Sequence, residues 1–208
     1  MKSVILFSLF LLMVLSCTQS EISSNTFKSE NTILIDISHG GKDPGAISKQ
    51  GTKEKDLSLN YASYINAELN RKKLGVIQTR TEDEFISLAD RVEMAEAKNI
   101  DVVVSIHFNA SRDPSKKGIK TYFKPECEKS KSLDNLFHAN VIASNLIKDN
   151  GGDPGVFFIL ENSPVPAILI DVGYLTNEED LKLIKDDEFK VKFASVLSET
   201  LVEYLRIY

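Results

Sequence analysis

The stretch that sets the fold reads Thr32-Ile33-Leu34-Ile35-Asp36-Ile37-Ser38-His39-Gly40-Gly41. Its first six residues are apolar or β-branched apart from Asp36, which predicts a short buried strand. Gly40 and Gly41 stop the strand and allow a sharp turn, and His39 stands at that turn. Further strand-like runs follow at residues 75–80, 101–108, 118–123, 156–160 and 167–172.

Segments with helical spacing of apolar residues alternate with these runs. The pattern predicts helices over residues 56–72, 87–98, 133–148, 177–185 and 189–207. Ser87 is the expected N-cap of the second helix, and Asn150-Gly151-Gly152 is the expected stop of the third. Such alternation predicts a single α/β domain with a mostly parallel, twisted sheet of about six strands, flanked by helices on both faces.

The first thirty residues do not fit this alternation. Met1-Lys2 precedes an apolar run, Val4 to Leu15, which is too short to span a bilayer comfortably and is typical of an export signal. The run ends in Val14-Leu15-Ser16-Cys17, which resembles the lipobox of bacterial lipoproteins. This resemblance implies a signal peptide at 1–16, a flexible tether at 17–30 with a lipidated Cys17, and a folded domain at 31–208. The alternatives are an ordinary signal peptide with an incidental cysteine, or a retained transmembrane anchor.

Charge and cysteine usage narrow the function classes. The formal net charge is −5 for 208 residues, and nucleic-acid binding is not expected without a clustered basic face. If Cys17 is acylated, Cys127 has no partner, so we predict no disulfide. The glutamates on both sides of Cys127 disfavour a thiolate, and we expect no catalytic role for it.

Polar side chains fall at or just beyond the ends of three predicted strands. They are His39, His107 and Asp171. Ligands bind at this edge of an open α/β sheet. A single histidine at a strand end is more often a hydrogen-bonded structural residue than a metal ligand, but two of the three histidines of the chain lie here. The third, His138, lies in a predicted helix and is expected at the surface or the edge of the core.

Six ordered motifs resemble those of zinc-dependent N-acetylmuramoyl-L-alanine amidases. The family pattern runs close to IDxGHGGxDPGA, GxxEKD, TRxxD, LxxRxxxAN, SIHxNA and PaxLvExGFxxN. This chain carries the corresponding residues at 35–46, 51–56, 79–83, 88–91, 105–110 and 166–177. The resemblance therefore covers essentially all of the chain from Thr32 onward, in the same order.

The resemblance implies one Zn²⁺ per chain, held by His39, Glu54 and His107, with water at the fourth position. On its own, Glu54 would be interpreted as a solvated acid at a helix start. The resemblance also implies hydrolysis of the amide between the lactyl group of N-acetylmuramic acid and L-alanine of the peptidoglycan stem peptide. Asp171 would act as general base and then as acid.

Other residues match family positions as well. We interpret Arg80 and Arg91 as ion-pair or loop-fixing residues, with a catalytic role as the alternative. Asn109 is expected to contact the substrate or to support a metal ligand, and Asp36 either orients a metal ligand or caps the loop. We expect a monomer, anchored through Cys17 in the cell envelope and facing the periplasm. The outer membrane is the expected site of the anchor, and the membrane of a single-membrane cell is the alternative. Whether an activator protein is needed stays open.

Asp171 is the main departure, because the family normally has glutamate there. Aspartate is one methylene shorter, and a misplacement of about 1 Å can cost on the order of 100-fold in rate. The backbone could compensate, the activity could be weakened or narrowed, or the chain could bind zinc and peptidoglycan without turnover. Glu161 could serve as a replacement base. A zinc carboxypeptidase that acts on the stem peptide is a further alternative, which the motif order argues against.

Overall fold

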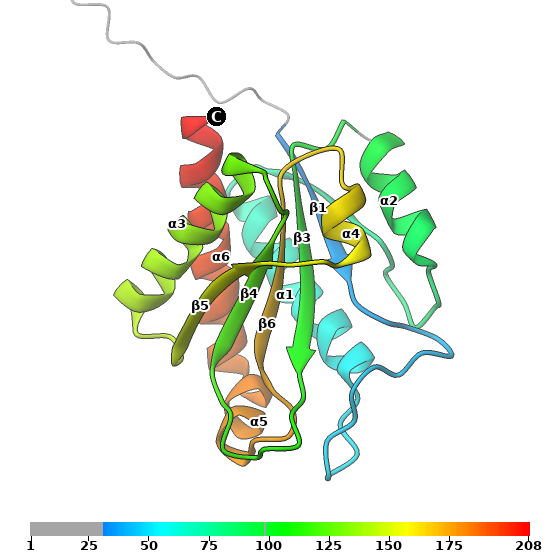
Figure 1. The fold of residues 1–208 in the computed structure, drawn as a ribbon, viewed down its shortest axis with the longest axis vertical. Coiled ribbons are helices and arrows are strands. Elements are labelled where there is room, and N and C mark those ends of the chain that lie inside the picture. Colours follow the sequence, from blue (N-terminus) through cyan, green and yellow to red (C-terminus); the bar gives the residue numbers. More distant parts are fainter. Residues whose placement is uncertain (1–30, 98) are drawn as a thin grey trace, which may run out of the picture.

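The centre of the molecule is a six-stranded sheet with the order β2-β1-β3-β6-β4-β5 (Figure 1). The computed structural model describes residues 31–97 and 99–208, so the predicted signal peptide, Cys17 and the tether lie outside the described residues. The strands are β1 Thr32–Ile37, β2 Gly75–Gln78, β3 Val102–Asn109, β4 Ile119–Phe123, β5 Asp149–Pro154 and β6 Ala167–Tyr174. Neighbouring strands are parallel except where β4 pairs antiparallel with β6.

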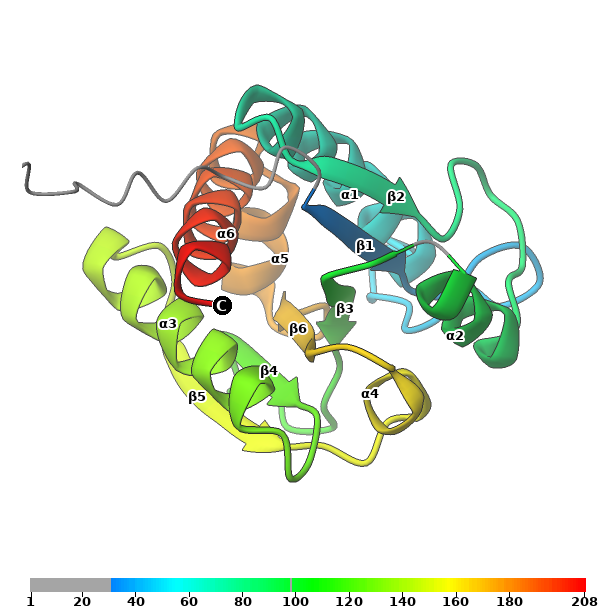
Figure 2. The same cartoon turned by 90° about the horizontal axis from the view of Figure 1, so that it is seen from above.

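Helices cover both faces of this sheet (Figure 2). One face carries α1 Glu54–Arg71, α3 Glu128–Ser144, α5 Glu178–Lys185 and α6 Asp187–Ile207. The other carries α2 Leu88–Ala97 and the short α4 Phe158–Asn162. The predicted α/β class, with a mostly parallel sheet between helical layers, is confirmed. Among the described residues, no helix is both long enough and apolar enough to span a membrane.

Alternation along the central strands divides their side chains between two apolar cores. In β3, Val104 and Ile106 join the larger core with α1, α3 and α6, while Val103 joins the smaller core under α2 and α4. In β6, Ile170 belongs to the larger core and Leu169 to the smaller one. Because successive side chains of a strand point to opposite faces, His107 and Asp171 lie on the α2/α4 face of the sheet.

The predicted end of the third helix is wrong. Helix α3 ends at Ser144, and Asn145 caps it in the left-handed conformation with φ 48°. Residues 149–154, which include the expected glycine stop, form the edge strand β5 instead. Polar and glycine-rich residues have low strand propensity, and they form a strand here because they pair with β4 at the sheet edge.

The predicted strand at residues 156–160 is also wrong. Val156 is exposed, and helix α4 begins at Phe158. In a short apolar run, the spacing of apolar residues alone does not distinguish a strand from a helix. Ile159 and Leu160 are buried against the smaller core, while Phe158 stays partly in solvent. The sheet has the predicted number of strands, but one of them comes from a different segment.

Candidate metal centre

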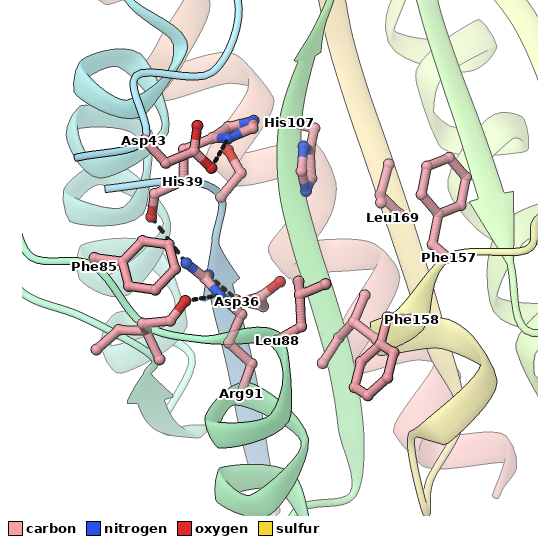
Figure 3. A pocket seen from close by; sticks show the side chains of 13 residues that line it. Asp36, His39, Asp43, Phe85, Leu88, Arg91, His107, Phe157, Phe158 and Leu169 are labelled. Atoms are coloured by element: carbon pink, nitrogen blue, oxygen red, sulfur yellow. Dashed lines mark hydrogen bonds and ion pairs between the residues drawn. The ribbon is translucent and has the colours of Figure 1, made fainter. Parts of the chain in front are cut away.

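Two histidines meet on the α2/α4 face, at the end of the sheet where β1 and β3 finish (Figure 3). His39 lies two residues after the end of β1, just ahead of the turn, and His107 lies near the end of β3. Their ring centroids are 5.4 Å apart. Glu54, the first residue of α1, completes the cluster, and each of the three offers a ligand atom within 4.8 Å of the others.

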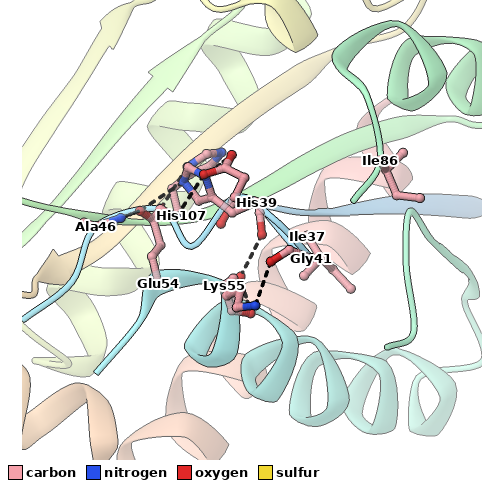
Figure 4. Close-up of polar contacts among 12 residues, drawn as sticks. Ile37, His39, Gly41, Ala46, Glu54, Lys55, Ile86 and His107 are labelled. Carbon is pink, nitrogen blue, oxygen red and sulfur yellow. Dashed lines mark hydrogen bonds and ion pairs between the residues drawn. The ribbon is translucent and has the colours of Figure 1, made fainter. Parts of the chain in front are cut away.

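Glu54 joins the two imidazoles (Figure 4). Its Oε2 lies 3.0 Å from His39 Nε2, and its Oε1 lies 3.1 Å from His107 Nδ1. The backbone N–H groups of Ala46 and Phe108 donate to the same carboxylate, at 2.9 Å and 3.0 Å. Burial alone would raise the pKa of Glu54, but the hydrogen bonds from the two imidazoles hold this pKa well below its ordinary value. Glu54 is therefore a buried anion and not a solvated helix-start acid.

The loop that carries His39 has an unusual backbone. His39 has a positive φ of 56°, and Gly40 follows at 126°. A Cβ at Gly40 would meet Glu84 O at 2.0 Å, and a Cβ at Gly45 would lie 2.5 Å from His39 Cδ2 and 2.7 Å from Glu54 Oε2. Only glycine therefore fits these two positions while the imidazole and the carboxylate stay where they are.

Two buried arginines donate hydrogen bonds to backbone carbonyl groups of the loop that carries His39. Arg91 pairs with Asp36 through Nη1 at 2.6 Å and donates through Nη2 to His39 O at 2.8 Å. Arg80 donates to Ser38 O at 2.9 Å and to Lys55 O at 2.8 Å. Asp36 accepts from Thr79, Arg91 and Ser105, and none of these partners is a ligand imidazole. The contacts favour loop fixing for Arg80, Arg91 and Asp36.

Asp43 contacts the outer nitrogen of His39, a role not predicted from the sequence. Its Oδ2 lies 2.8 Å from His39 Nδ1, on the opposite side of the ring from Glu54. Burial alone would lower the pKa of His39, but the contacts with Glu54 and then Asp43 raise it. A carboxylate on the free nitrogen of a metal-binding histidine fixes the tautomer and the orientation of the ring. Its only sequence signal was its place in the glycine-rich motif.

The donor set fits zinc. Catalytic zinc sites use three protein ligands, and two histidines with one glutamate are a known combination. Here two imidazole nitrogens and an ionised carboxylate oxygen converge from three separate segments. The hydrogen bonds within the cluster keep the ligand atoms close together, as a shared cation requires.

Asp171 stands beside His107 in the register of β3 and β6. The register then shifts, so that Asn109 pairs with Tyr174 and β6 carries one extra residue. Asn109 Nδ2 donates to Asp171 Oδ2 at 2.8 Å. Burial is the main cause that raises the pKa of Asp171 to about 6, with the Glu54 charge in the same sense and His107 and Asn109 opposing it. The structure thus places a buried carboxyl group with a raised pKa beside the cluster.

Three other residues named from the sequence lie elsewhere. Of the two alternatives for His138, the structure shows the edge of the core and not the surface. His138 is buried, and its ring nitrogens lie 2.5 Å from Asp149 Oδ1 and 2.6 Å from Thr121 Oγ1, on the strands β5 and β4 at the sheet edge. Polar partners on β4 and β5 satisfy this histidine, and they could not be located without the β5 strand. Cys127 is a free thiol at the N-cap of α3. Glu161 is exposed on α4.

Known proteins resemble this chain in both sequence and fold. The family described as N-acetylmuramoyl-L-alanine amidase matches residues 33–202. The N-acetylmuramoyl-L-alanine amidase LytC of Bacillus subtilis is 32% identical over 177 residues, which are 84% of this chain and 36% of LytC. A crystal structure of an N-acetylmuramoyl-L-alanine amidase from Clostridium difficile 630 superimposes with a TM-score of 0.82 at 32% identity, covering 85% of this chain and 97% of that one. The CwlD amidase from Clostridioides difficile, in complex with the GerS lipoprotein, has a TM-score of 0.81 at 26% identity, covering 86% and 100%.

The fold and the cluster define an α/β protein with a candidate metal centre at the ends of its parallel strands. The chain belongs to the N-acetylmuramoyl-L-alanine amidase family, and cell-wall amidases are among its relatives. The family resemblance of the six sequence motifs is confirmed.

Proposed function

We propose that this chain is a zinc-dependent N-acetylmuramoyl-L-alanine amidase, which hydrolyses the amide between the lactyl group of N-acetylmuramic acid and L-alanine of the peptidoglycan stem peptide. One observation carries the proposal. A His39–Glu54–His107 cluster with the donor set of catalytic zinc lies beside Asp171, a carboxyl group of raised pKa.

Different side chains would carry out the different steps of amide hydrolysis. When bound by the cluster, zinc would polarise the scissile carbonyl and lower the pKa of a bound water towards about 7. Asp171 accepts the proton of the attacking water and returns it to the nitrogen of L-alanine as the amide breaks. A pKa of about 6 suits both transfers, since the group is neither too weak a base nor too weak an acid near neutral pH. Asn109 holds the carboxylate in place, and Asp43 orients His39.

The setting of the reaction is part of the same proposal. Peptidoglycan is the substrate, and a lipid on Cys17 with the tether behind it would hold the domain at the outer membrane, facing the periplasm. CwlD is solved in complex with a lipoprotein, GerS, so a partner that activates this chain is worth seeking in pull-down experiments.

Asp171 favours a second candidate function. With aspartate in place of the family's usual glutamate, the chain would be a zinc-dependent peptidoglycan-binding lipoprotein with weak or no turnover. In this case the cluster would bind zinc and the substrate, but the shorter Asp171 side chain would lie too far from the attacking water and the leaving nitrogen to transfer the proton between them.

Digestion of purified sacculi separates these candidates. We expect the full chain, loaded with zinc, to release stem peptides that begin with L-alanine and to leave glycan strands free of peptide, as detected by mass spectrometry. His107→Ala, which removes a proposed ligand, should release none. Release of D-alanine alone would instead indicate a carboxypeptidase. If the parent chain binds sacculi and releases nothing, while Asp171→Glu releases stem peptides, the second candidate is correct.

A further inference from the structure

A cavity of about 370 Å³ opens from the metal centre into the space between α2 and α4 (Figure 3). His39 and His107 are part of its lining, so the cavity and the metal centre share a wall. Asp36, Arg91 and Leu169 form the deeper part. Its size falls within the range of small-molecule sites, which is about 300–1,000 Å³.

The walls of this cavity are aromatic and aliphatic. Phe85 and Leu88 line it from the α2 side, and Phe158 lines it from α4. These side chains remain 46%, 57% and 44% exposed, and large apolar side chains gathered at the surface mark binding sites. The two charged side chains of the deeper part, Asp36 and Arg91, neutralise each other, because both are buried and they are paired at 2.6 Å. The cavity therefore suits an uncharged ligand with apolar faces.

The proposed reaction decides which half of the substrate lies here. The leaving amine must reach Asp171, which returns the proton to it. Asp171 is not in the lining of the cavity and lies beyond His107, where β6 neighbours β4. Asp171 lies two residues beyond Leu169 along β6, and Leu169 is in the lining. The stem peptide therefore extends towards the end of β6 and the segment between β3 and β4, and the acyl half, the sugar with its lactyl arm, extends back towards Leu169 into the cavity.

The surrounding charges agree with this direction. Glu82, Asp83 and Glu84 are exposed next to Phe85 at the cavity, while Asp83 is paired with Lys55 at 2.6 Å and Lys42 Nζ lies 4.4 Å from the Phe85 ring centroid. Three acids face two lysines there, and the remaining negative charge would repel the carboxylates of a stem peptide. The segment between β3 and β4 carries Arg112 and Lys116, both exposed, while Lys120, the register partner of Asp171 on β4, is already paired with Asp153 at 2.5 Å. The sugar half of the substrate has no charge, because its only carboxyl group is in the scissile amide.

We infer that the α2/α4 cavity is a saccharide subsite, which binds the N-acetylmuramic acid ring with its apolar face and acetamido methyl group against Phe85 and Phe158. This inference rests on the proposed function, since it uses the position of the leaving amine. It makes the sugar a recognised part of the substrate and not only a carrier of the scissile bond.

Two substrates test it on the zinc-loaded full chain. One is N-acetylmuramoyl-L-alanyl-D-glutamate, and the other is the same dipeptide acylated with D-lactate alone. We expect kcat/KM to be at least about 10-fold higher with the sugar. Phe85→Ala and Phe158→Ala should each remove most of this preference through a higher KM for the first substrate, with a clearly smaller change in KM for the second. Val156→Ala is the matched control, because Val156 is exposed on the same segment and is not in the cavity lining.

Binding of the two compounds to the metal-free chain, measured by NMR titration, tests the saccharide subsite independently of the amidase reaction. The sugar-bearing dipeptide should bind more tightly than the lactyl dipeptide, and Phe158→Ala should equalise them. If neither compound is hydrolysed but this binding difference is found, the amidase proposal fails and the saccharide subsite stands. Equal losses with both substrates, or no change with either, would overturn the subsite and point to a cavity that holds the peptide or another partner.

Discussion

Asn109 holds the carboxylate of Asp171 across the β3–β6 pair, with a hydrogen bond of 2.8 Å from its side-chain amide. The bond forms where the register shifts by one residue, just beyond the pairing of His107 with Asp171. The other side-chain atom of Asn109, Oδ1, accepts from Ala110 N at 2.8 Å, so the amide cannot flip without losing both bonds.

Asn109→Ala should lower kcat by about 10- to 100-fold, because the proposed base loses the partner that fixes its position. KM and zinc content should change little, since Asn109 is not a ligand of the cluster. Steady-state kinetics and elemental analysis of the purified variant measure these quantities. Asn70→Ala, at an exposed asparagine of α1, is the control. A loss of zinc together with kcat would show that Asn109 supports the metal centre instead.

Asp43→Asn should weaken zinc binding by about 10- to 100-fold although all three ligands remain. The substitution removes the negative charge that lies 2.8 Å from His39 Nδ1. Competition with a chromophoric chelator measures the affinity. Asp113→Asn, which removes an exposed charge in the turn after β3, should leave the affinity unchanged. If both variants bind zinc as the parent does, the contact between Asp43 and His39 does not tune the metal.

Arg91→Ala should lower the free energy of unfolding by about 3–5 kcal/mol, because it leaves the Asp36 carboxylate buried without its cation. The loss of the bond to His39 O should also loosen the ligand loop. Urea denaturation of the metal-free protein reports the stability without a contribution from zinc. Arg71→Ala, which breaks an exposed pair with Glu68, should leave the midpoint unchanged. A small effect at Arg91 would mean that Thr79 and Ser105 are sufficient partners for Asp36.

The contribution of His138 to stability should fall as the pH rises. Burial lowers the pKa of His138, but the carboxylates of Asp134 and Asp149 outweigh it and raise this pKa above 6.5. The folded state therefore binds a proton more tightly than the unfolded state. The resulting stabilisation is complete below the unfolded pKa and is lost as the pH rises through the folded one.

His138→Gln tests this directly. The difference in unfolding free energy between the parent and this variant should be largest at pH 5.5–6 and should shrink steadily above 6.5. Urea titrations across this range, with zinc absent, give the difference. A constant difference at all pH values would mean that His138 stays neutral in the folded protein and acts only through hydrogen bonds.

The sequence was most informative where strands are buried on both faces. The runs that form β1, β3 and β6 are apolar because helices cover both of their sides, and the polar residues within or just beyond these runs include those of the site. His39, His107 and Asp171 therefore stand out in the sequence itself, as polar residues in apolar surroundings. Glu54 does not, since only the family motif distinguishes it from an ordinary acid at a helix start.

The errors fall where local sequence carries little information. β5 is polar and glycine-rich, and its pairing with β4 comes from tertiary structure. Missing this strand also hid the partners of His138, because Asp149 would have belonged to a loop. Asp43 was missed for a different reason: its contact with His39 depends on the positive φ of His39 and Gly40, which no spacing rule predicts.

The alternation of β6 also limits how the chain can evolve. Leu169 and Asp171 share one face of this strand, and Ile168, Ile170 and Val172 share the other. A deletion of one codon ahead of Asp171, with the start of β6 held in register, would turn the carboxylate into the main core and bring Val172 beside His107. Loops such as the one after β3 can change length without this exchange. New specificities should therefore arise through loop lengths and through substitutions on the α2/α4 face, while the number of residues in β6 stays fixed.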